Sequence, residues 1–292
     1  MATTKTTTKE VLGVYGPGSN HFVGDGFPVR NLFPSNGVKQ VSPFLLLDYA
    51  GPAYFPPANQ PRGVGEHPHR GFETVTIAYQ GAVDHRDSGG NSGTIRPGDV
   101  QWMTAASGVV HEEKHEREFA QRGGAFEMVQ LWVNLPKAYK MTAPRYQSIV
   151  SDQIPTVDLG PGAFARVIAG ELNGIAGPAK TFTPVNLFDL RMNPGSTAEL
   201  NLPEGHNTAI VLLGGDVTVN AKQLEGEAQL AVLSPTGTAV SLTAKEHSLL
   251  LVLGGEPINE PVASHGPFVM NTQAELRQAI EDYKAGKMGH LQ

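Results

Sequence analysis

The segment His67-Pro68-His69-Arg70-Gly71-Phe72-Glu73 opens the stretch that decides the fold, and Gly108-Val109-Val110-His111-Glu112-Glu113 closes it. Each end carries two metal-ligating side chains two residues apart: His67 with His69, and His111 with Glu113. In a β-strand, residues i and i+2 point to the same face, so each pair can aim two ligands at one side of a sheet. If the two strands face each other inside a barrel, three imidazoles and one carboxylate converge. That ligand set suits a divalent transition metal.

Two other interpretations compete for the same residues. Glu112 is also a carboxylate next to His111, but strand alternation turns it away from the face that His111 and Glu113 share. The run from His111 to His115 also matches the H-E-x-x-H signature of zinc peptidases. That signature needs a helix, and Gly108-Val109-Val110 just before it is a poor helix former. We therefore expect a strand that carries His111 and Glu113 as ligands.

The residues around the ligands suggest how they are supported. A metal-bound imidazole needs a partner for its second ring nitrogen, and the polar candidates are Glu66, Glu73, His85 and Gln101. Large apolar side chains nearby either line a pocket for a flat ligand or form the barrel core; these are Phe72, Trp102, Met103, Phe126 and Met128.

Length and turn residues predict an all-β protein of two domains. The 292 residues suffice for about two domains, and 34 Gly and 22 Pro suit short strands separated by turns. Strand-like runs include residues 10–15, 43–48, 72–79, 100–104, 109–113 and 125–133, and they continue through the second half. Residues 50–65 contain four prolines and are expected to form an irregular loop. We predict antiparallel β-barrel domains at residues 1–140, with the metal, and 141–292, without it.

The second half repeats features of the first and ends differently. Residues 208–215 resemble residues 74–81, which indicates one barrel duplicated. His206 and His247 each lack a paired ligand, so no metal is expected in the second barrel. Thr272-Gln273-Ala274-Glu275 is a capping-box pattern and Gly286 suits a helix C-terminus. A short C-terminal α-helix is therefore expected.

Charge and composition exclude several classes of partner. The net charge of −6 disfavours direct nucleic-acid binding, which uses clustered positive charge. The absence of cysteine excludes disulfides and thiolate metal sites. Residues 1–10 are polar and contain no signal-peptide core, and no run approaches the ~18 apolar residues of a membrane span. We expect a cytoplasmic protein that binds no membrane.

Several blocks of sequence resemble a known family. His67-x-His69, Glu73, Gly81 and Gly108-x-x-His111 are similar to the two cupin motifs, with one extra residue before Gly81 and Ala106 where the second motif usually has Pro. The resemblance to the pirin family is closer, and its blocks cover most of the chain: residues 67–75, 97–105, 108–113, 140–146 and 266–272.

This resemblance implies a fold, a metal site and two kinds of function. Pirins are bicupins, with two barrels face to face and metal only in the N-terminal one. The family ligands carry over onto His67, His69, His111 and Glu113, and the usual metal is iron. Some members cleave the flavonol quercetin with dioxygen, whereas others are regulatory partners of transcription factors or metabolic enzymes.

The predicted function is an Fe(II)-dependent dioxygenase of the quercetin 2,3-dioxygenase type. Its substrates are a flavonol-like aromatic compound and dioxygen, and Glu113 is its catalytic base. The alternative is a non-catalytic, iron-dependent regulatory protein that binds a protein partner. The ligand set also accepts Mn, Co, Ni, Cu or Zn. The sequence leaves open the native metal, the physiological substrate, the partner and the oligomeric state.

Overall fold

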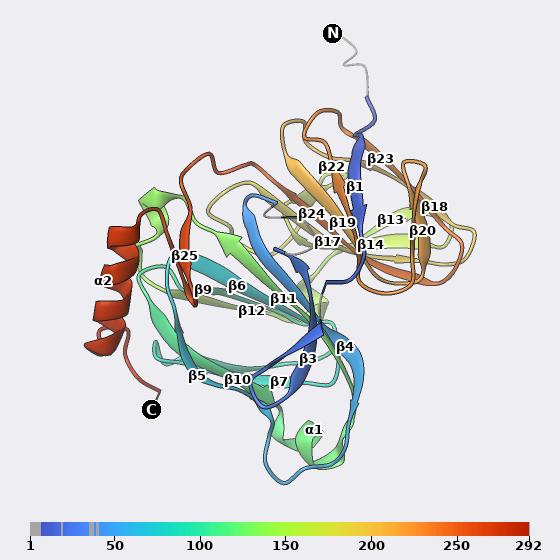
Figure 1. Ribbon diagram of the computed structural model, residues 1–292. Coiled ribbons are helices and arrows are strands. Elements are labelled where there is room, and N and C mark those ends of the chain that lie inside the picture. Colours follow the sequence, from blue (N-terminus) through green and yellow to red (C-terminus); the bar gives the residue numbers. More distant parts are fainter. Residues whose placement is uncertain (1–6, 19, 35–37, 39–40, 292) are drawn as a thin grey trace. The chain divides into compact units, whose positions relative to one another are not determined.

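The computed structural model describes residues 7–18, 20–34, 38 and 41–291 and divides the chain into two compact units (Figure 1). Unit 1 comprises residues 1–18, 32–43 and 152–257, and unit 2 comprises residues 19–31, 44–151 and 258–292. The predicted boundary at residue 140 concerns the linear order of the domains and stays a prediction. In space, each unit also takes a segment from the other end of the chain.

Unit 2 contains a seven-stranded and a four-stranded sheet, and its described strand pairings are antiparallel. In sheet order the larger sheet comprises β12 (Arg145–Ile149), β9 (Val100–Thr104), β6 (Phe72–Gln80), β11 (Gly124–Asn134), β4 (Phe44–Phe55), β3 (Phe27–Phe33) and β2 (Asn20–Val23). The smaller sheet comprises β5 (Gly63–His69), β10 (Val109–His115), β7 (Val83–Asp87) and β8 (Ser92–Ile95). Further elements are α1 (Arg117–Arg122), η1 (Lys137–Tyr139), the pair β25 (Ala263–His265) and β26 (Phe268–Met270), and α2 (Gln273–Lys284).

Unit 1 has the same two kinds of sheet. Its larger sheet comprises β1 (Val11–Tyr15), β22 (Gln229–Leu233), β19 (Asn207–Gly214), β24 (Ser248–Gly255), β17 (Val185–Met192), β14 (Ala163–Ala169) and β13 (Thr156–Gly160). Its smaller sheet comprises β18 (Thr197–Asn201), β23 (Ala239–Ala244), β20 (Asp216–Val219) and β21 (Lys222–Glu225). A separate hairpin pairs β15 (Glu171–Leu172) with β16 (Ile175–Ala176), and η2 (Ser151–Gln153) precedes β13.

The two units share one strand order, which supports the predicted duplication. The similar segments lie in β6 and β19, and each of these strands is third from the end of its seven-stranded sheet. In the four-stranded sheets, β5 and β10 of unit 2 take the places that β18 and β23 take in unit 1. The same strand order thus surrounds an interior in each unit, and the side chains in the two interiors differ.

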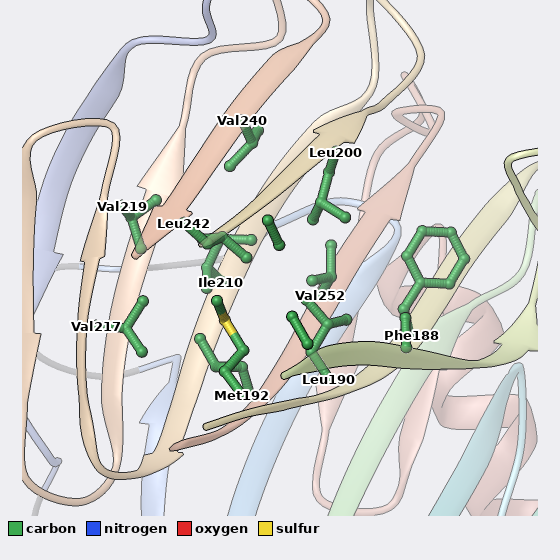
Figure 2. Close-up of a cluster of buried hydrophobic side chains, with 14 of the residues drawn as sticks. Phe188, Leu190, Met192, Leu200, Ile210, Val217, Val219, Val240, Leu242 and Val252 are labelled. Carbon is green, nitrogen blue, oxygen red and sulfur yellow. The ribbon is translucent and has the colours of Figure 1, made fainter. Parts of the chain in front are cut away.

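The interior of unit 1 is filled by apolar side chains (Figure 2). Alternate residues of both sheets meet there, as strand periodicity requires; examples are Leu190, Leu200, Val240, Leu242 and Val252. Each is at most 1% exposed, so each contributes roughly 1.5–3 kcal/mol relative to full exposure. Strands β18 and β23 therefore carry apolar residues where β5 and β10 carry histidines.

The expected loop at residues 50–65 is only partly correct. Strand β4 continues to Phe55, and β5 begins at Gly63. The prediction took proline as a sign of a loop, but Pro52 lies within strand β4. It lies where the register of β4 and β11 shifts, between the pairs Met128↔Ala50 and Phe126↔Ala53. A proline at such a bulge removes no hydrogen bond from the regular ladder.

The ends of the chain are ordered more extensively than their sequences indicate. Residues 1–6 of the predicted polar terminus lie outside the described residues. Lys9, however, is fully buried and donates hydrogen bonds to the backbone carbonyls of His206, Ser234 and Pro235. At the other end, α2 begins after a complete Thr272–Glu275 capping box, which confirms the predicted helix. Within the described residues, no helix is long and apolar enough to cross a membrane.

Candidate metal centre

Strands β5 and β10 place three of the four predicted ligands together. The strands pair antiparallel, and His67 lies directly opposite His111. His69 follows on the same strand, and its ring centroid is 4.9 Å from that of His111 and 4.8 Å from that of His67. The region from His111 to His115 is strand, not helix, so the peptidase interpretation is wrong.

The ring nitrogens of these histidines are oriented toward one another. The Nε2 atoms of His67 and His69 are 3.1 Å apart. The Nδ1 atom of His67 lies 2.7 Å from the carbonyl oxygen of Gly65 and can only donate to it, which leaves Nε2 with a lone pair. The Nδ1 atom of His69 lies 3.4 Å from the carbonyl of Pro267. When His69 donates its proton from Nδ1 to this carbonyl, its Nε2 atom also carries a lone pair, and the two Nε2 atoms can then bind one cation.

Burial keeps the imidazoles of His69 and His111 neutral. Desolvation, with a smaller contribution from His67, lowers the pKa of His69 to about 3. Desolvation also lowers the pKa of His111 well below its usual value. The Nε2 atom of His111 is buried and has no hydrogen-bond partner, which is costly unless a ligand satisfies it. Neutral imidazoles with unused lone pairs are the form that coordinates metal, so these residues fit a metal ion.

Glu113 lines the same cavity as His67 and His69, and its carboxylate is held by other residues. Its Oε1 atom accepts hydrogen bonds from the Thr76 hydroxyl at 3.0 Å and the Gln101 amide at 3.1 Å. Among the described residues, the potential metal-binding groups are two, and they overlap: His67, His69 and His111 form one, and His85, His111 and Glu113 form the other. His111 belongs to both, but the four predicted ligands do not form one group.

Glu112 lies on the other face of the strand, as alternation predicts. Its carboxylate contacts Arg86 and lies 3.1 Å from Lys114 Nζ, and these cations contribute to lowering the pKa of Glu112 against the opposing effect of burial. Glu112 and Glu113 line two different cavities. The sequence argument thus separated the two neighbouring carboxylates correctly.

The cavity beside the ligands is largely apolar. Its volume is about 290 Å³, near the lower end of the range for small-molecule sites. His67, His69 and Glu113 line it, together with apolar residues such as Trp132 and Met128. Trp132 packs against His69 with ring centroids 5.3 Å apart, so a flat ligand in this cavity would lie beside the imidazoles.

Comparison with known proteins places this architecture in a family. The pirin family model matches residues 26–133, and the model of the pirin C-terminal cupin domain matches residues 187–289. A Mus musculus protein named "Pirin" is 38% identical over 99% of this chain and 96% of its own length. The chain belongs to the pirin family.

Other members of the pirin family carry enzyme names. A Pseudomonas aeruginosa protein named "Putative quercetin 2,3-dioxygenase" is 54% identical over 96% of this chain and 98% of its own. The crystal structure of a quercetin 2,3-dioxygenase from Acinetobacter baumannii is 54% identical and covers 97% of this chain and 99% of that one, with a TM-score of 0.93. The predicted mostly-β fold of two cupin domains with a short C-terminal helix is confirmed.

The sequence argument identified some of the supporting residues and missed others. Gln101 contacts Glu113, as reported above, and His85 Nδ1 lies 3.4 Å from His111 Nδ1. Glu73 instead accepts a hydrogen bond from Thr104 on the opposite face of β6, and Glu66 is exposed. Thr76 was not predicted, because a threonine inside a strand is an ordinary core residue until the strand pairing is known.

Most of the apolar residues proposed as pocket walls belong to the protein core. Phe72, Trp102, Met103 and Phe126 are at most 1% exposed and do not line the cavity. Met128 lines it, and Trp132 was missed. The sequence placed large apolar residues near the ligands but could not separate those that face the cavity from those that fill the barrel.

The C-terminal segment supports the turn that follows the ligand His69. Arg70, next to His69, is buried and donates through NH1 to Asp282 of α2 at 2.8 Å and through Nε to the Ser107 carbonyl at 2.6 Å. The Nζ atom of buried Lys140 bonds the carbonyls of Gly71 and Val269 at 2.7 and 3.0 Å. Residues from the middle and last segments of unit 2 thus hold the turn after His69.

Proposed function

We propose that the protein is a metal-dependent dioxygenase that opens the central ring of a flavonol, with His67, His69, His111 and Glu113 holding one metal ion. The observation that carries this proposal is the cluster of His67 with the buried His69 and His111, next to an apolar cavity that His67, His69 and Glu113 line. The names of two relatives that are 54% identical, given above, support the choice of reaction.

The supporting contacts suit Glu113 to a double role. Thr76 and Gln101 hold its Oε1 atom, whereas its Oε2 atom accepts no hydrogen bond from the described residues. That second oxygen remains available to bind metal or to accept a proton. We assign Glu113 as the base that takes the proton from the flavonol hydroxyl, because a base must lie within hydrogen-bond reach of the proton it removes.

The other residues bind and orient the substrate. A bound divalent metal would supply Lewis acidity and lower the pKa of the substrate hydroxyl. Apolar residues such as Trp132 and Met128 exclude water and favour a flat aromatic ligand. The overall reaction consumes one dioxygen and one flavonol and releases one carbon monoxide and one phenolic ester. The ester retains both oxygen atoms of dioxygen, and carbon monoxide carries away the C3 carbon of the flavonol with the oxygen already bonded to it.

The proposal is tested by turnover with a defined metal. Purified protein is loaded anaerobically with Fe(II), mixed with quercetin and then exposed to air, while flavonol absorbance and carbon monoxide are measured. We expect one carbon monoxide per quercetin consumed, and loss of activity in Glu113→Gln and His111→Ala. Turnover no faster than that of free Fe(II) would exclude the enzyme.

The proposed native metal is iron, and it is tested separately. Protein purified without added metal is analysed for its metal content, and each metal found is assayed with quercetin. Two results together would favour the regulatory alternative over the enzyme. The protein would turn over no quercetin with any metal, and its Fe(II) and Fe(III) forms would bind a captured protein partner differently.

A further inference from the structure

Two polar side chains interrupt the apolar wall of the ligand cavity. Asp48 of β4 and Gln130 of β11 lie directly opposite each other in the strand ladder, and both line the cavity. Their neighbours on the same faces, Leu46 and Met128, also line it and are apolar. Side chains directly opposite each other in an antiparallel pair have Cβ atoms about 4.5–5.5 Å apart, so one ligand edge can reach both.

The Asp48 carboxylate has an unused acceptor. Its Oδ1 atom accepts a hydrogen bond from the Asn31 amide at 2.7 Å. Its Oδ2 atom lies 3.9 Å from His21 Nε2, which is beyond hydrogen-bond distance. Burial raises the pKa of Asp48 against the opposing effect of Asn31, which reflects a carboxylate poorly supplied with solvent. A donor on a ligand in the cavity would satisfy Oδ2.

The Gln130 amide likewise has one end without a partner. Its Oε1 atom lies 3.0 Å from the Thr76 hydroxyl, and its Nε2 atom has no hydrogen-bond partner among the described residues. Thr76 has a single proton to share between Gln130 and Glu113, which both lie 3.0 Å away. The amide meets Thr76 equally well with its NH2 group turned toward the hydroxyl. In either orientation, its other end is left for a ligand.

We propose that Asp48 and Gln130 select aromatic ligands that carry two vicinal hydroxyl groups. One hydroxyl donates to the carboxylate. The second meets the free end of the amide in either orientation, because a hydroxyl both donates and accepts. A ligand without the vicinal pair leaves one polar group unsatisfied in an apolar cavity, and such a loss is penalised more than a lost apolar contact. This selection rests on the proposed function, since it concerns the substrate of the same site.

The test compares two flavonols that differ by one hydroxyl. Quercetin has a vicinal hydroxyl pair on its outer ring, and kaempferol has only one of those two groups. Binding to the Zn(II)-loaded protein is measured by tryptophan fluorescence, because this redox-inert metal separates binding from turnover. We expect wild type to bind quercetin at least about tenfold more tightly than kaempferol. The preference should fall below about threefold in Asp48→Asn and, independently, in Gln130→Leu.

Met128→Leu is the matched control, because Met128 lines the same cavity beside Gln130 without a polar group. It should change both affinities by the same factor and preserve the preference. If quercetin binds but either polar variant keeps the full preference, or wild type shows none, the selection is refuted and the proposed function stands. If wild type binds neither flavonol, both are refuted.

Discussion

Thr76→Val is the most informative single change, because the same strand supplies its own control. Thr76 is fully buried, and its hydroxyl contacts Glu113 and Gln130. Thr74 lies on the same face of β6, is equally buried, and has a hydroxyl without a hydrogen-bond partner. Valine replaces threonine at either position with nearly the same volume, so the two variants differ in the hydrogen bond that is lost.

The expected effect follows from the contacts of Glu113. Its Oε1 atom accepts two hydrogen bonds, and Thr76→Val removes one of them. A hydrogen bond to a charged group contributes about 1.5–3 kcal/mol, and changes to residues that support metal ligands cost about 10–100-fold in metal affinity. Because Gln101 still holds Glu113, we expect the lower end: roughly tenfold weaker metal binding, equivalent to about 1.4 kcal/mol.

The measurement is metal affinity by competition with a chelator, together with the free energy of unfolding of the metal-free protein. Thr74→Val should leave metal affinity within about twofold and should not reduce stability, because it removes an unsatisfied buried hydroxyl that costs about 1–3 kcal/mol. Equal metal affinities for the two valine variants would show that Thr76 does not position Glu113.

Three further predictions concern stability. The pKa of His69 is about 3 in the folded protein and 6.5 ordinarily, so on acidification the unfolded chain takes up the proton first. The free energy of unfolding of the metal-free protein should therefore fall by about 2 kcal/mol between about pH 7 and 5 because of this group. Urea unfolding that shows no such fall would contradict the reasoning. The pKa of Lys140 is lowered to about 8 from 10.5, mainly by burial, so stability should rise by up to about 3 kcal/mol from pH 8 to 10.5; a Lys140→Met variant should lack that rise. Gly71→Ala should destabilise the protein by more than about 2 kcal/mol, because φ is +90° and the new Cβ would lie 1.9 Å from the Val269 carbonyl oxygen. Gly214→Ala is the control, because its new Cβ would meet no atom within 4 Å. Equal thermal unfolding of both variants would refute the argument.

Strand alternation allowed the sequence to predict local parts of the site. It paired His67 with His69 and separated Glu112 from Glu113, because these relations depend on only a few consecutive residues. It could not predict Thr76 as a partner of Glu113, because that contact depends on how β6 sits relative to β10 in three dimensions. The grouping of Glu113 with His85 instead of His67 was likewise not visible, since the strand register shifts between His111 and Glu113.

The fold was predictable where a local signal had a single meaning. The capping box of α2 specified a helix start at Thr272, and the structure has it there. The prolines near Pro52 had two meanings, a loop or a bulged strand, and composition alone favoured the wrong one. The packing of α2 against Arg70 was not predictable, because it links residues 212 positions apart through one ion pair.

The contact between Arg70 and Asp282 also constrains the order of events during protein synthesis. Most strands of unit 2 are translated before residue 152, but the segment with Asp282, which holds the turn after His69, follows residue 257. Unit 1 has all its segments once residue 257 has emerged. Since domains fold as their chains become available, we expect the apolar barrel to fold first, whereas the histidine-bearing barrel reaches its final form only after residues 258–292 have emerged.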